Sequence, residues 1–292
     1  MVTHVCVVGS VNMDATLRVD ALPRPGETVL ASSVSHAPGG KGGNQAVAAA
    51  RAGARVQFVG AIGDDAAAGQ LREHLCANRV GLDATVTLPG PSGTAVIVVD
   101  AGGENTIVVA PGANGRLTVD AGGARAVITA CDVLLVQLEI PVATAVAAAR
   151  HARSAGAVVM VNASPGGQDP AALAELASLA DVVIANETEA DEWPFTPEHL
   201  VVTLGARGAR YVGADGEVAV PAPAVKAVDT TGAGDVFAGT LAASWPPGPG
   251  SPDQRLRALR RACAAGALAT LVRGAGDCAP DAEAIDAAVR GE

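Results

Sequence analysis

The sequence predicts an α/β protein: a Rossmann-like, doubly wound and mostly parallel sheet flanked by helices, with a small antiparallel β lid. Three observations support this fold class. Short runs of Val, Ile and Leu alternate with Ala-rich helical stretches along most of the 292 residues. Several of these runs are continuously apolar, as strands buried on both faces of a parallel sheet are. Of two other segments, one alternates with a period of two residues and the other reads as two strands joined by a turn, which is typical of antiparallel strands.

The strands of the main sheet are predicted from short apolar runs that are followed by a helical stretch or a turn. They lie at residues 4–9, 55–60, 132–138, 157–162, 181–185, 200–204 and 209–213. The predicted helices lie at residues 43–52, 66–78, 119–130, 141–155, 170–179, 234–244, 253–271 and 281–290. Gly53, Gly81 and Gly156 follow three of these helices, where glycine commonly ends a helix.

Two segments, residues 14–38 with a period of two and a Pro/Gly turn, and residues 92–110, interrupt the strand–helix alternation. Each reads as a pair of strands joined by a turn. We therefore expect one α/β domain formed by residues 1–13, 39–91 and 111–292, with the two segments inserted into it as a β lid. Such a lid could cover a ligand, because open α/β sheets bind ligands at the carboxyl ends of their strands. The alternative is a pair of surface hairpins without a lid role.

Composition excludes several classes of protein. The net charge is −10 and the longest basic run is Arg260-Arg261, so a nucleic-acid or anionic-membrane surface is not expected. No run approaches the ~18 apolar residues of a membrane-spanning helix. Residues 1–9 lack the charged start and long apolar region of a signal peptide. The five cysteines are far apart, which fits reduced thiols in the cytoplasm. We therefore expect a cytoplasmic protein.

The strongest local signal is DTTGAGDVFAG at residues 229–239. The small residues Gly232, Ala233 and Gly234 leave backbone N–H groups unshielded, and a helical pattern begins directly after them. A helix N-terminus with bare amides favours an anion. Asp235 falls in the first turn, where a carboxylate beside a phosphate could take a proton from an attacking hydroxyl. The alternative is that Asp235 caps its own helix.

A second signal is the glycine loop GGKGGNQ at residues 39–45, which precedes an Ala-rich helix. Glycines allow a ligand to approach the backbone, and Lys41 and Asn44 supply polar groups for hydroxyls. The loop is not a Walker A motif, because Lys41 is followed by Gly42. Lys41 is one of only two lysines in a chain with 18 arginines. The alternative is a flexible turn that leads into a helix.

Three weaker motifs stand at predicted strand ends. Asn12 and Asp14 are two residues apart, so in an extended chain they lie on one side and could hold vicinal hydroxyls; an Asx-turn is the alternative. Asn186 and Glu189 could hold Mg²⁺ through waters, or simply begin a helix rich in acids. Residues 201–209 form a strand with a glycine turn, which could pass close to a nucleotide or merely join two strands.

Together these motifs resemble the ribokinase branch of the PfkB carbohydrate-kinase family. The glycine loop, NETEA (186–190), TLGARG (203–208) and DTTGAGD occur in the order of the family and span nearly the whole chain. GSVNMD, PGETV, GEN, PGAN and QLE point to the ribokinase branch. The resemblance implies transfer of phosphate from ATP to the 5-hydroxyl of D-ribose, giving ribose 5-phosphate and ADP. It also implies the use of Mg²⁺ and K⁺, and a homodimer formed through the β lid.

The resemblance further implies roles for individual residues. Asp235 would be the catalytic base, and the amides of Gly232, Ala233 and Gly234 the anion hole. The sugar contacts would be Asn12, Asp14, Gly40, Lys41, Asn44, Glu139 and Asp235. The ATP contacts would be Asn186, Thr203, Gly205, Gly208 and Gly234, with Glu189 near Mg²⁺ through water. K⁺ would be bound by Asp229 and by the carbonyls of Thr231, Ala269, Val272 and Gly274.

Three features depart from the family pattern. The family has a longer helical connection after NETEA, whereas residues 187–200 just supply the roughly a dozen residues that a parallel crossover needs. We therefore expect a missing helix and an exposed sheet face there. Cys278 stands where ribokinases commonly have Ser near the K⁺ site, and a thiol is a poorer ligand for K⁺. Asn162-Ala163-Ser164-Pro165 replaces the usual Asn-Pro-Ala-Pro.

Two alternatives to a ribose kinase stay open. One is a sibling kinase for another furanose or nucleoside, such as deoxyribose, adenosine or pseudouridine. The other is a sugar- or nucleotide-binding protein that kept the fold and lost catalysis, because a fold does not determine a function. The intact Asp235 and the glycine loop argue against the second.

Overall fold

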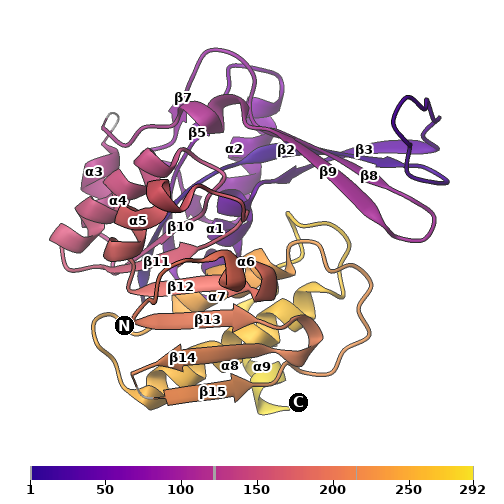
Figure 1. Cartoon of the computed structure of the whole chain (residues 1–292). Coiled ribbons are helices and arrows are strands. Elements are labelled where there is room, and N and C mark those ends of the chain that lie inside the picture. Colours follow the sequence, from indigo (N-terminus) through magenta and orange to yellow (C-terminus); the bar gives the residue numbers. More distant parts are fainter. Residues whose placement is uncertain (1, 121–122, 215, 292) are drawn as a thin grey trace.

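A nine-stranded sheet forms the centre of the protein (Figure 1). The computed structural model describes residues 2–120, 123–214 and 216–291. The strand order is β15-β14-β13-β12-β11-β10-β1-β4-β6. These are β1 (His4–Val8), β4 (Arg55–Val59), β6 (Val80–Gly81), β10 (Val133–Val136), β11 (Val158–Asn162), β12 (Val182–Asn186), β13 (His199–Thr203), β14 (Ala209–Gly213) and β15 (Gly216–Val220). Neighbouring strands pair in parallel from β6 across to β13, whereas the pairs β13–β14 and β14–β15 are antiparallel. The predicted doubly wound, mostly parallel sheet is therefore confirmed.

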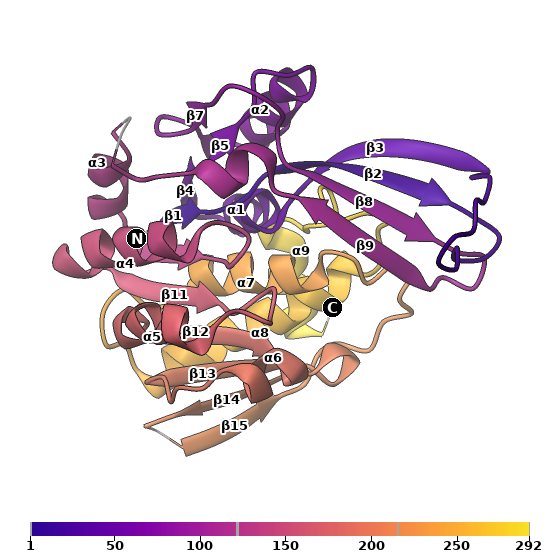
Figure 2. The same ribbon diagram turned by 45° about the horizontal axis from the view of Figure 1, so that its top comes forward.

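Helices cover both faces of this sheet (Figure 2). One face carries α1 (Lys41–Arg51), α2 (Ala67–Ala77), α7 (Ala233–Ser244), α8 (Pro252–Ala269) and α9 (Ala282–Arg290). The other carries α3 (Ala124–Thr129), α4 (Val142–Ser154) and α5 (Pro170–Leu179). All four residues of β10 are fully buried between the two layers, which explains its unbroken apolar sequence. None of the helices in the described part of the chain is long and apolar enough to cross a membrane.

One predicted helix, at residues 119–130, is shorter than expected. The described part begins at Ala124, and residues 121–122 lie outside the described part of the chain. Leu117 and Val119, which precede it, are buried in the core without being helical. Gly123 precedes α3 with a left-handed φ of 78°, which is why the helix does not extend toward the N-terminus.

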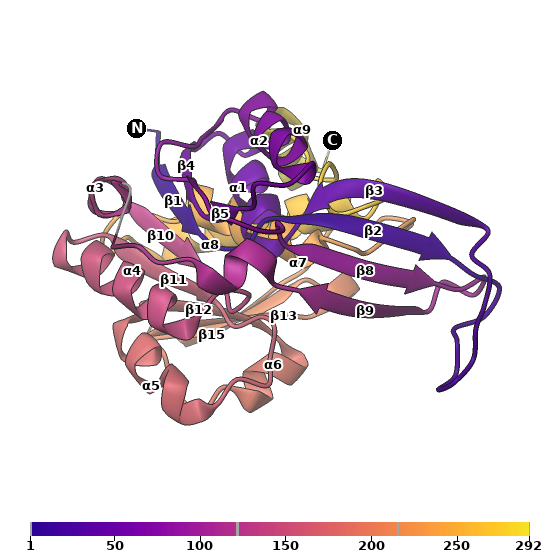
Figure 3. The same ribbon diagram turned by 90° about the horizontal axis from the view of Figure 1, so that it is seen from above.

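A second sheet projects from the α/β body (Figures 1 and 3). It contains β2 (Asn12–Arg18), β3 (Ser33–Gly39), β8 (Thr94–Val99) and β9 (Asn105–Ala110), in the order β3-β2-β8-β9. Each predicted segment forms an antiparallel pair, and the two pairs join through β2 and β8, which run parallel. Val34, Val96 and Val108 are exposed on this sheet. A smaller sheet pairs β5 (Ala61–Ile62) with β7 (Val86–Thr87) at its base.

The connection between β12 and β13 differs from the exposed sheet face that the sequence predicts there. A short helix, α6 (Glu187–Glu192), fills part of it, and the sheet face beside it is not exposed: Val183 and Ala185 are both buried. Trp193, only 8% exposed, joins their core cluster, and its ring meets that of Phe195 edge to face at 6.2 Å. Two aromatic side chains therefore pack where the absence of a longer helix was expected to leave the sheet exposed. The expectation of an exposed sheet face is wrong.

Candidate active site

Several of the predicted site residues meet at the carboxyl ends of the parallel strands, where the N-termini of α1 and α7 also lie. A pocket of about 170 Å³ opens there. It is lined by Lys41, Asn162, Ser164, Ile184, Ala185, Asn186, Glu189, Thr203, Gly232, Gly234 and Asp235. This edge is where open α/β sheets bind ligands. Segments nearly 200 residues apart in the sequence thus contribute to one pocket.

Asp235, in the first turn of α7, is buried and held by side chains of α1. Its Oδ2 accepts a hydrogen bond from Nδ2 of Asn44 at 3.0 Å, and its Oδ1 accepts one from Nε2 of Gln45 at 3.0 Å. The two helices approach closely at Gly239, where a Cβ would lie 2.3 Å from the carbonyl oxygen of Gln45. Both hydrogen bonds of this carboxylate within the described residues come from α1, so it does not cap its own helix.

The N-terminus of α7 forms one wall of the pocket. Gly232 precedes the helix with φ 80°, and a Cβ there would lie 2.8 Å from the Cα of Ala275. The amide of Ala233 donates to the carbonyl of Thr230 at 3.3 Å. Within the described residues, the amides of Gly232 and Gly234 donate to no protein acceptor, and Gly234 has open space where a side chain would be. Two free amides at a helix N-terminus favour an anion.

Lys41, the first residue of α1, is a cation among carboxylates. Burial alone would lower the pKa of its ammonium group, but the carboxylates of Asp235, Glu139 and Glu189 raise it overall. Oε2 of Glu139 accepts hydrogen bonds from the hydroxyl of Ser10 at 2.6 Å and from the backbone amide of Lys41 at 3.2 Å. Glu139, which follows β10 in the chain, therefore lies beside Lys41 of the glycine loop.

The loop also depends on Gly40. Its φ is 84°, and a Cβ there would lie 2.8 Å from the backbone nitrogen of Asn12. Asn12 is buried, and its Oδ1 accepts a hydrogen bond from Nδ2 of Asn114 at 2.8 Å. The glycine loop and the start of β2 therefore pack directly against each other, which fixes the base of the β lid beside Lys41.

Asp14, two residues further along β2, is a second partly buried acid of the site. Its pKa is raised to about 7 by burial and by the charges of Glu139 and Asp235, which outweigh a hydrogen bond from the backbone of Ala95. Its Oδ1 is buried and has no hydrogen-bond partner among the described residues. A Cβ on Gly39 would lie 2.0 Å from its Oδ2. Asp14 therefore offers an unused acceptor that a hydroxyl could occupy.

The expected nucleotide residues are only partly brought together. Asn186 and Glu189 form a capping box at the start of α6: Oδ1 of Asn186 accepts from the amide of Glu189 at 2.8 Å, and Oε2 of Glu189 accepts from the amide of Asn186 at 3.0 Å. Both also line the pocket, as Thr203 does. Gly205 and Gly208 lie in the turn after β13 and do not line it. A Cβ on Gly208 would lie 2.1 Å from the carbonyl oxygen of Val220, so packing alone also requires glycine at this position.

The residues expected around K⁺ gather behind the N-terminus of α7. The carboxylate of Asp229 accepts from the amides of Thr231 at 2.9 Å and Gly274 at 3.0 Å. Burial alone would raise the pKa of Asp229, but hydrogen bonds from the side chain of Thr231 and from these two amides, with the charge of Arg273, lower it overall. The carbonyl of Ala269 accepts from the amide of Val272 at 3.2 Å. The described residues hold no cluster of three or more His, Cys, Asp or Glu side chains that could bind a metal.

Cys278 lies beside this group. Its Sγ is 3.3 Å from the carbonyl oxygen of Ala275 and 3.8 Å from that of Thr231, and it donates to both. Burial, together with the nearby charges of Asp235 and Asp229, raises the pKa of the thiol to about 11. At neutral pH Cys278 is therefore a neutral thiol, directed toward one of the carbonyls that would bind the cation.

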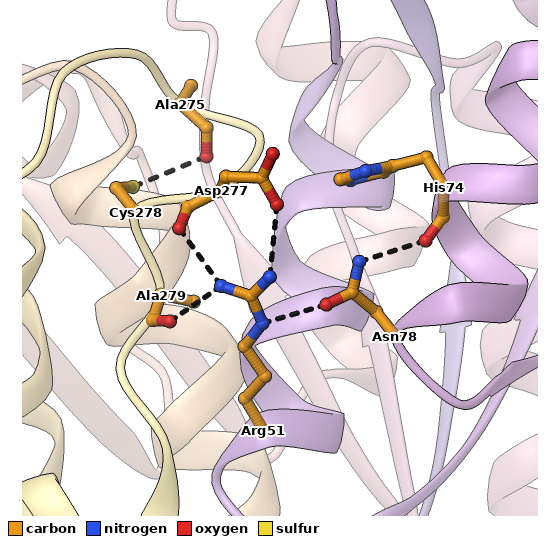
Figure 4. A network of polar contacts seen from close by, with 7 residues as sticks. All are labelled: Arg51, His74, Asn78, Ala275, Asp277, Cys278 and Ala279. Carbon is orange, nitrogen blue, oxygen red and sulfur yellow. Dashed lines mark hydrogen bonds and ion pairs between the residues drawn. The ribbon is translucent and has the colours of Figure 1, made fainter.

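Arg51, at the end of α1, holds the loop that carries Cys278 (Figure 4). Its guanidinium donates to the carbonyls of Asp277 at 2.9 Å and Ala279 at 2.8 Å, and to the Asp277 carboxylate at 3.0 Å. Its Nε donates to Oδ1 of Asn78 at 2.7 Å. The helix that begins with Lys41 therefore ends by fixing the loop beside the cation region.

A known protein family matches almost the whole chain. The sequence model of the family described as pfkB family carbohydrate kinase matches residues 2–282. The chain belongs to the pfkB family of carbohydrate kinases. This agrees with the resemblance carried by the glycine loop and DTTGAGD. The match extends over the α/β body and the β lid alike.

Individual members of the pfkB family are similar over most of their length. The ribokinase of Bacillus subtilis (strain 168) is 38% identical over 243 residues, which cover 80% of this chain and 83% of that protein. The deoxyribokinase of Salmonella typhi is 33% identical over 265 residues, covering 82% and 84%. The structure of Arabidopsis thaliana ribokinase complexed with ribose and ATP superposes with a TM-score of 0.88 at 28% identity, covering 99% of both chains.

Four side chains of the site have no role in the sequence-based prediction: Ser10, Gln45, Asn114 and Gln137. Each lies within a motif that carries the resemblance, namely GSVNMD, the glycine loop, PGAN or QLE. Their hydrogen bonds fix Glu139, Asp235, Asn12 and Gln45, respectively. A polar residue inside an otherwise apolar or glycine-rich motif is the signal that could have identified them.

Proposed function

We propose that the chain is a ribokinase, which transfers the terminal phosphoryl group of ATP to the 5-hydroxyl of D-ribose and yields ribose 5-phosphate and ADP. One observation carries the proposal: the Asp235 carboxylate, the Lys41 ammonium group and two free amides of α7 line a single pocket. Phosphoryl transfer needs this combination of base, cation and anion hole. The similarity to ribokinases, one of them solved with ribose and ATP, supports this choice of substrates.

In the proposed mechanism Asp235 accepts the proton of the attacking hydroxyl, a role that typically contributes ~10²–10⁴-fold to the rate. The amides of Gly232 and Gly234 stabilise the charge on the transferring phosphoryl group. The amide of Ala233 would have to share its hydrogen with the carbonyl of Thr230 to take part. The ammonium group of Lys41 lies close enough to Asp235 to stabilise negative charge at the point of attack.

The sugar would bind between the glycine loop and β2. Asp14 presents a buried acceptor without a partner, and Glu139 and Asn44 present further polar groups around Lys41. Asn12 and Gly40 shape this side of the site through their contact with each other. Acceptors arranged in this way suit the several hydroxyls of a pentose.

The ATP phosphates would lie against α7, with Asn186 and Thr203 on the opposite wall and the turn at Gly205 and Gly208 further along. Mg²⁺, when bound, would neutralise phosphate charge, and Glu189 would hold it through water. Asp229 and the carbonyls of Thr231, Ala269, Val272 and Gly274 fit a monovalent cation such as K⁺, because they supply oxygen donors beside the anion hole.

The proposal extends to assembly and location. We assign residues 14–38 and 92–110 to a lid that closes over the sugar, with residues 1–13, 39–91 and 111–292 as the kinase domain. Exposed Val34, Val96 and Val108 give this lid an apolar surface, which would be covered in a homodimer. The cytoplasm, where thiols remain reduced, is the compartment that fits five free cysteines.

A second candidate substrate is 2-deoxyribose, because the Salmonella typhi deoxyribokinase is 33% identical. Asp14 and Glu139 favour the sugar with more hydroxyls. A panel of ribose, 2-deoxyribose, adenosine and pseudouridine, each with ATP and Mg²⁺ and with ADP release as the signal, separates these candidates. We expect the highest kcat/KM for ribose. A higher value for any other substrate would replace ribose, and absence of ATP turnover and ATP binding would favour a non-catalytic protein.

A further inference from the structure

A buried chain of amides connects the central sheet to Asp235. Nε2 of Gln137, just after β10, donates to Oε1 of Gln45 at 2.8 Å, and Nε2 of Gln45 donates to Oδ1 of Asp235 at 3.0 Å. Gln45 and Gln137 are both fully buried. Neither belongs to the lining of the pocket. Gln45 therefore contacts the Asp235 carboxylate, and Gln137 contacts Gln45, without either side chain facing the ligand.

The order of donors along this chain is set by Asp235, because a carboxylate only accepts hydrogen bonds. Nε2 of Gln45 therefore faces Asp235, and its Oε1 accepts from Nε2 of Gln137. Gln137 in turn is confined by Gly9, where a Cβ would lie 1.8 Å from its Oε1. This Oε1 is buried and has no partner among the described residues. An unpaired buried acceptor lowers the free energy of unfolding. The amide of Gln137 nevertheless keeps the orientation in which its Nε2 donates to Oε1 of Gln45.

We propose that Gln45 is a positioning residue for Asp235 and that Gln137 orients Gln45. The inference rests on the proposed kinase function, in which Asp235 must point one carboxylate oxygen at the attacking hydroxyl. Asn44 and Gln45 each hold one oxygen, which leaves the carboxylate a single orientation at the pocket edge. Without Gln45 the carboxylate would be held on one side only and would rotate. Small errors in such geometry lower the rate strongly.

The kinetic test replaces Gln45 with methionine, which has a similar shape and no amide. We expect Gln45→Met to lower kcat roughly ten- to hundredfold, the equivalent of one hydrogen bond to a charged group, while the ribose KM stays within about threefold because Gln45 does not face the ligand. Gln137→Met should lower kcat in the same direction by less. A kcat within twofold of wild type in Gln45→Met would overturn the proposal.

Gln57 provides a matched control. Its Nε2 donates to the carboxylate of Asp83 at 2.8 Å, its Oε1 is a buried acceptor without a described partner, and a Cβ on Gly81 would lie 2.6 Å from its amide. Gln57 is half-buried rather than fully buried, and it repeats the amide–carboxylate contact on β4, away from the pocket. Gln57→Met should keep the wild-type kcat. An equal loss in Gln57→Met, or an equal rise of KM in Gln45→Met, would show a merely structural effect and overturn the proposal.

A second readout does not depend on turnover. In ¹H–¹⁵N spectra the side-chain amide signals of Gln45, Gln137 and Gln57 are identified by their loss in the three methionine variants. Asp235→Asn should shift the signals of Gln45 and, through it, Gln137, and should leave those of Gln57 in place. Unchanged Gln45 signals would overturn the amide chain. If the wild type phosphorylates none of the panel, the proposed function fails and these spectra still decide whether the chain of amides exists.

Discussion

Asp14 gives the sharpest link between the structure and a solution measurement, because its pKa of about 7 lies far above the usual value of 3.8. The perturbation is Asp14→Asn, which keeps the shape and one acceptor and removes the charge. In the ligand-free protein the charged form of Asp14 is disfavoured by burial and by Glu139 and Asp235. The variant should therefore be more stable than the wild type at neutral pH, although it should bind ribose less well.

The sign follows from proton binding. Below pH 3.8 Asp14 is protonated in both folded and unfolded chains, so it contributes no difference. Between pH 3.8 and about 7 the folded chain keeps the proton and the unfolded chain releases it, so the free energy of unfolding falls as pH rises. At about 1.4 kcal/mol per pH unit, the wild type should lose roughly 2–3 kcal/mol relative to Asp14→Asn between pH 5 and pH 7. Above pH 7 the difference should level off.

Urea unfolding of both proteins without ligand at pH 5, 6, 7 and 8 measures this difference, and contributions of the other groups cancel between them. Asp20→Asn, which removes an exposed carboxyl next to the same sheet, is the control and should follow the wild type at every pH. Parallel stability curves for Asp14→Asn and the wild type, with no divergence between pH 5 and 7, would refute the reasoning.

Four other predictions concern the site and the lid. Lys41→Arg should raise the ribose KM and leave the fold intact, because a planar guanidinium does not fit the glycine loop; steady-state kinetics with circular dichroism check this. Cys278→Ser should lower the K⁺ concentration for half-maximal activity, since a hydroxyl is the better ligand, and an unchanged K⁺ titration would count against the cation site. Arg51→Met should cost roughly 2–4 kcal/mol of unfolding free energy, because hydrogen bonds to charged groups contribute ~1.5–3 kcal/mol; chemical denaturation measures it. Light scattering should show a dimer that Val108→Lys converts to a monomer, whereas a monomeric wild type would remove the lid interface.

Much of the fold could be predicted because its signals are local. The fully buried β10 required an unbroken apolar run, which is visible in the sequence. The coverage of the sheet beside α6 could not be predicted in this way. It depends on where Trp193 and Phe195 turn, which is a matter of tertiary packing in a segment without periodicity.

The residues of the candidate site could likewise be predicted only where their signals are local. Glycines and polar residues in motifs identify Lys41 and Asp235, because these patterns are contiguous. The contact between Gln45 and Asp235 joins residues 190 positions apart, and nothing local in either motif indicates it. The parallel pairing of β2 with β8 is likewise non-local. Sequence patterns thus predicted which residues form the candidate site, whereas the contacts that orient them required the structure.

The central claim is that Asp235 is the base of an ATP-dependent ribose kinase. The most direct test compares wild type and Asp235→Asn for ADP release with ribose, ATP, Mg²⁺ and K⁺ at saturating concentrations. We predict ribose-dependent turnover by the wild type and a kcat that is lower by ~10²–10⁴-fold or more in Asp235→Asn, with the thermal unfolding midpoint still showing a folded protein. Normal turnover in a folded Asp235→Asn variant would contradict the account.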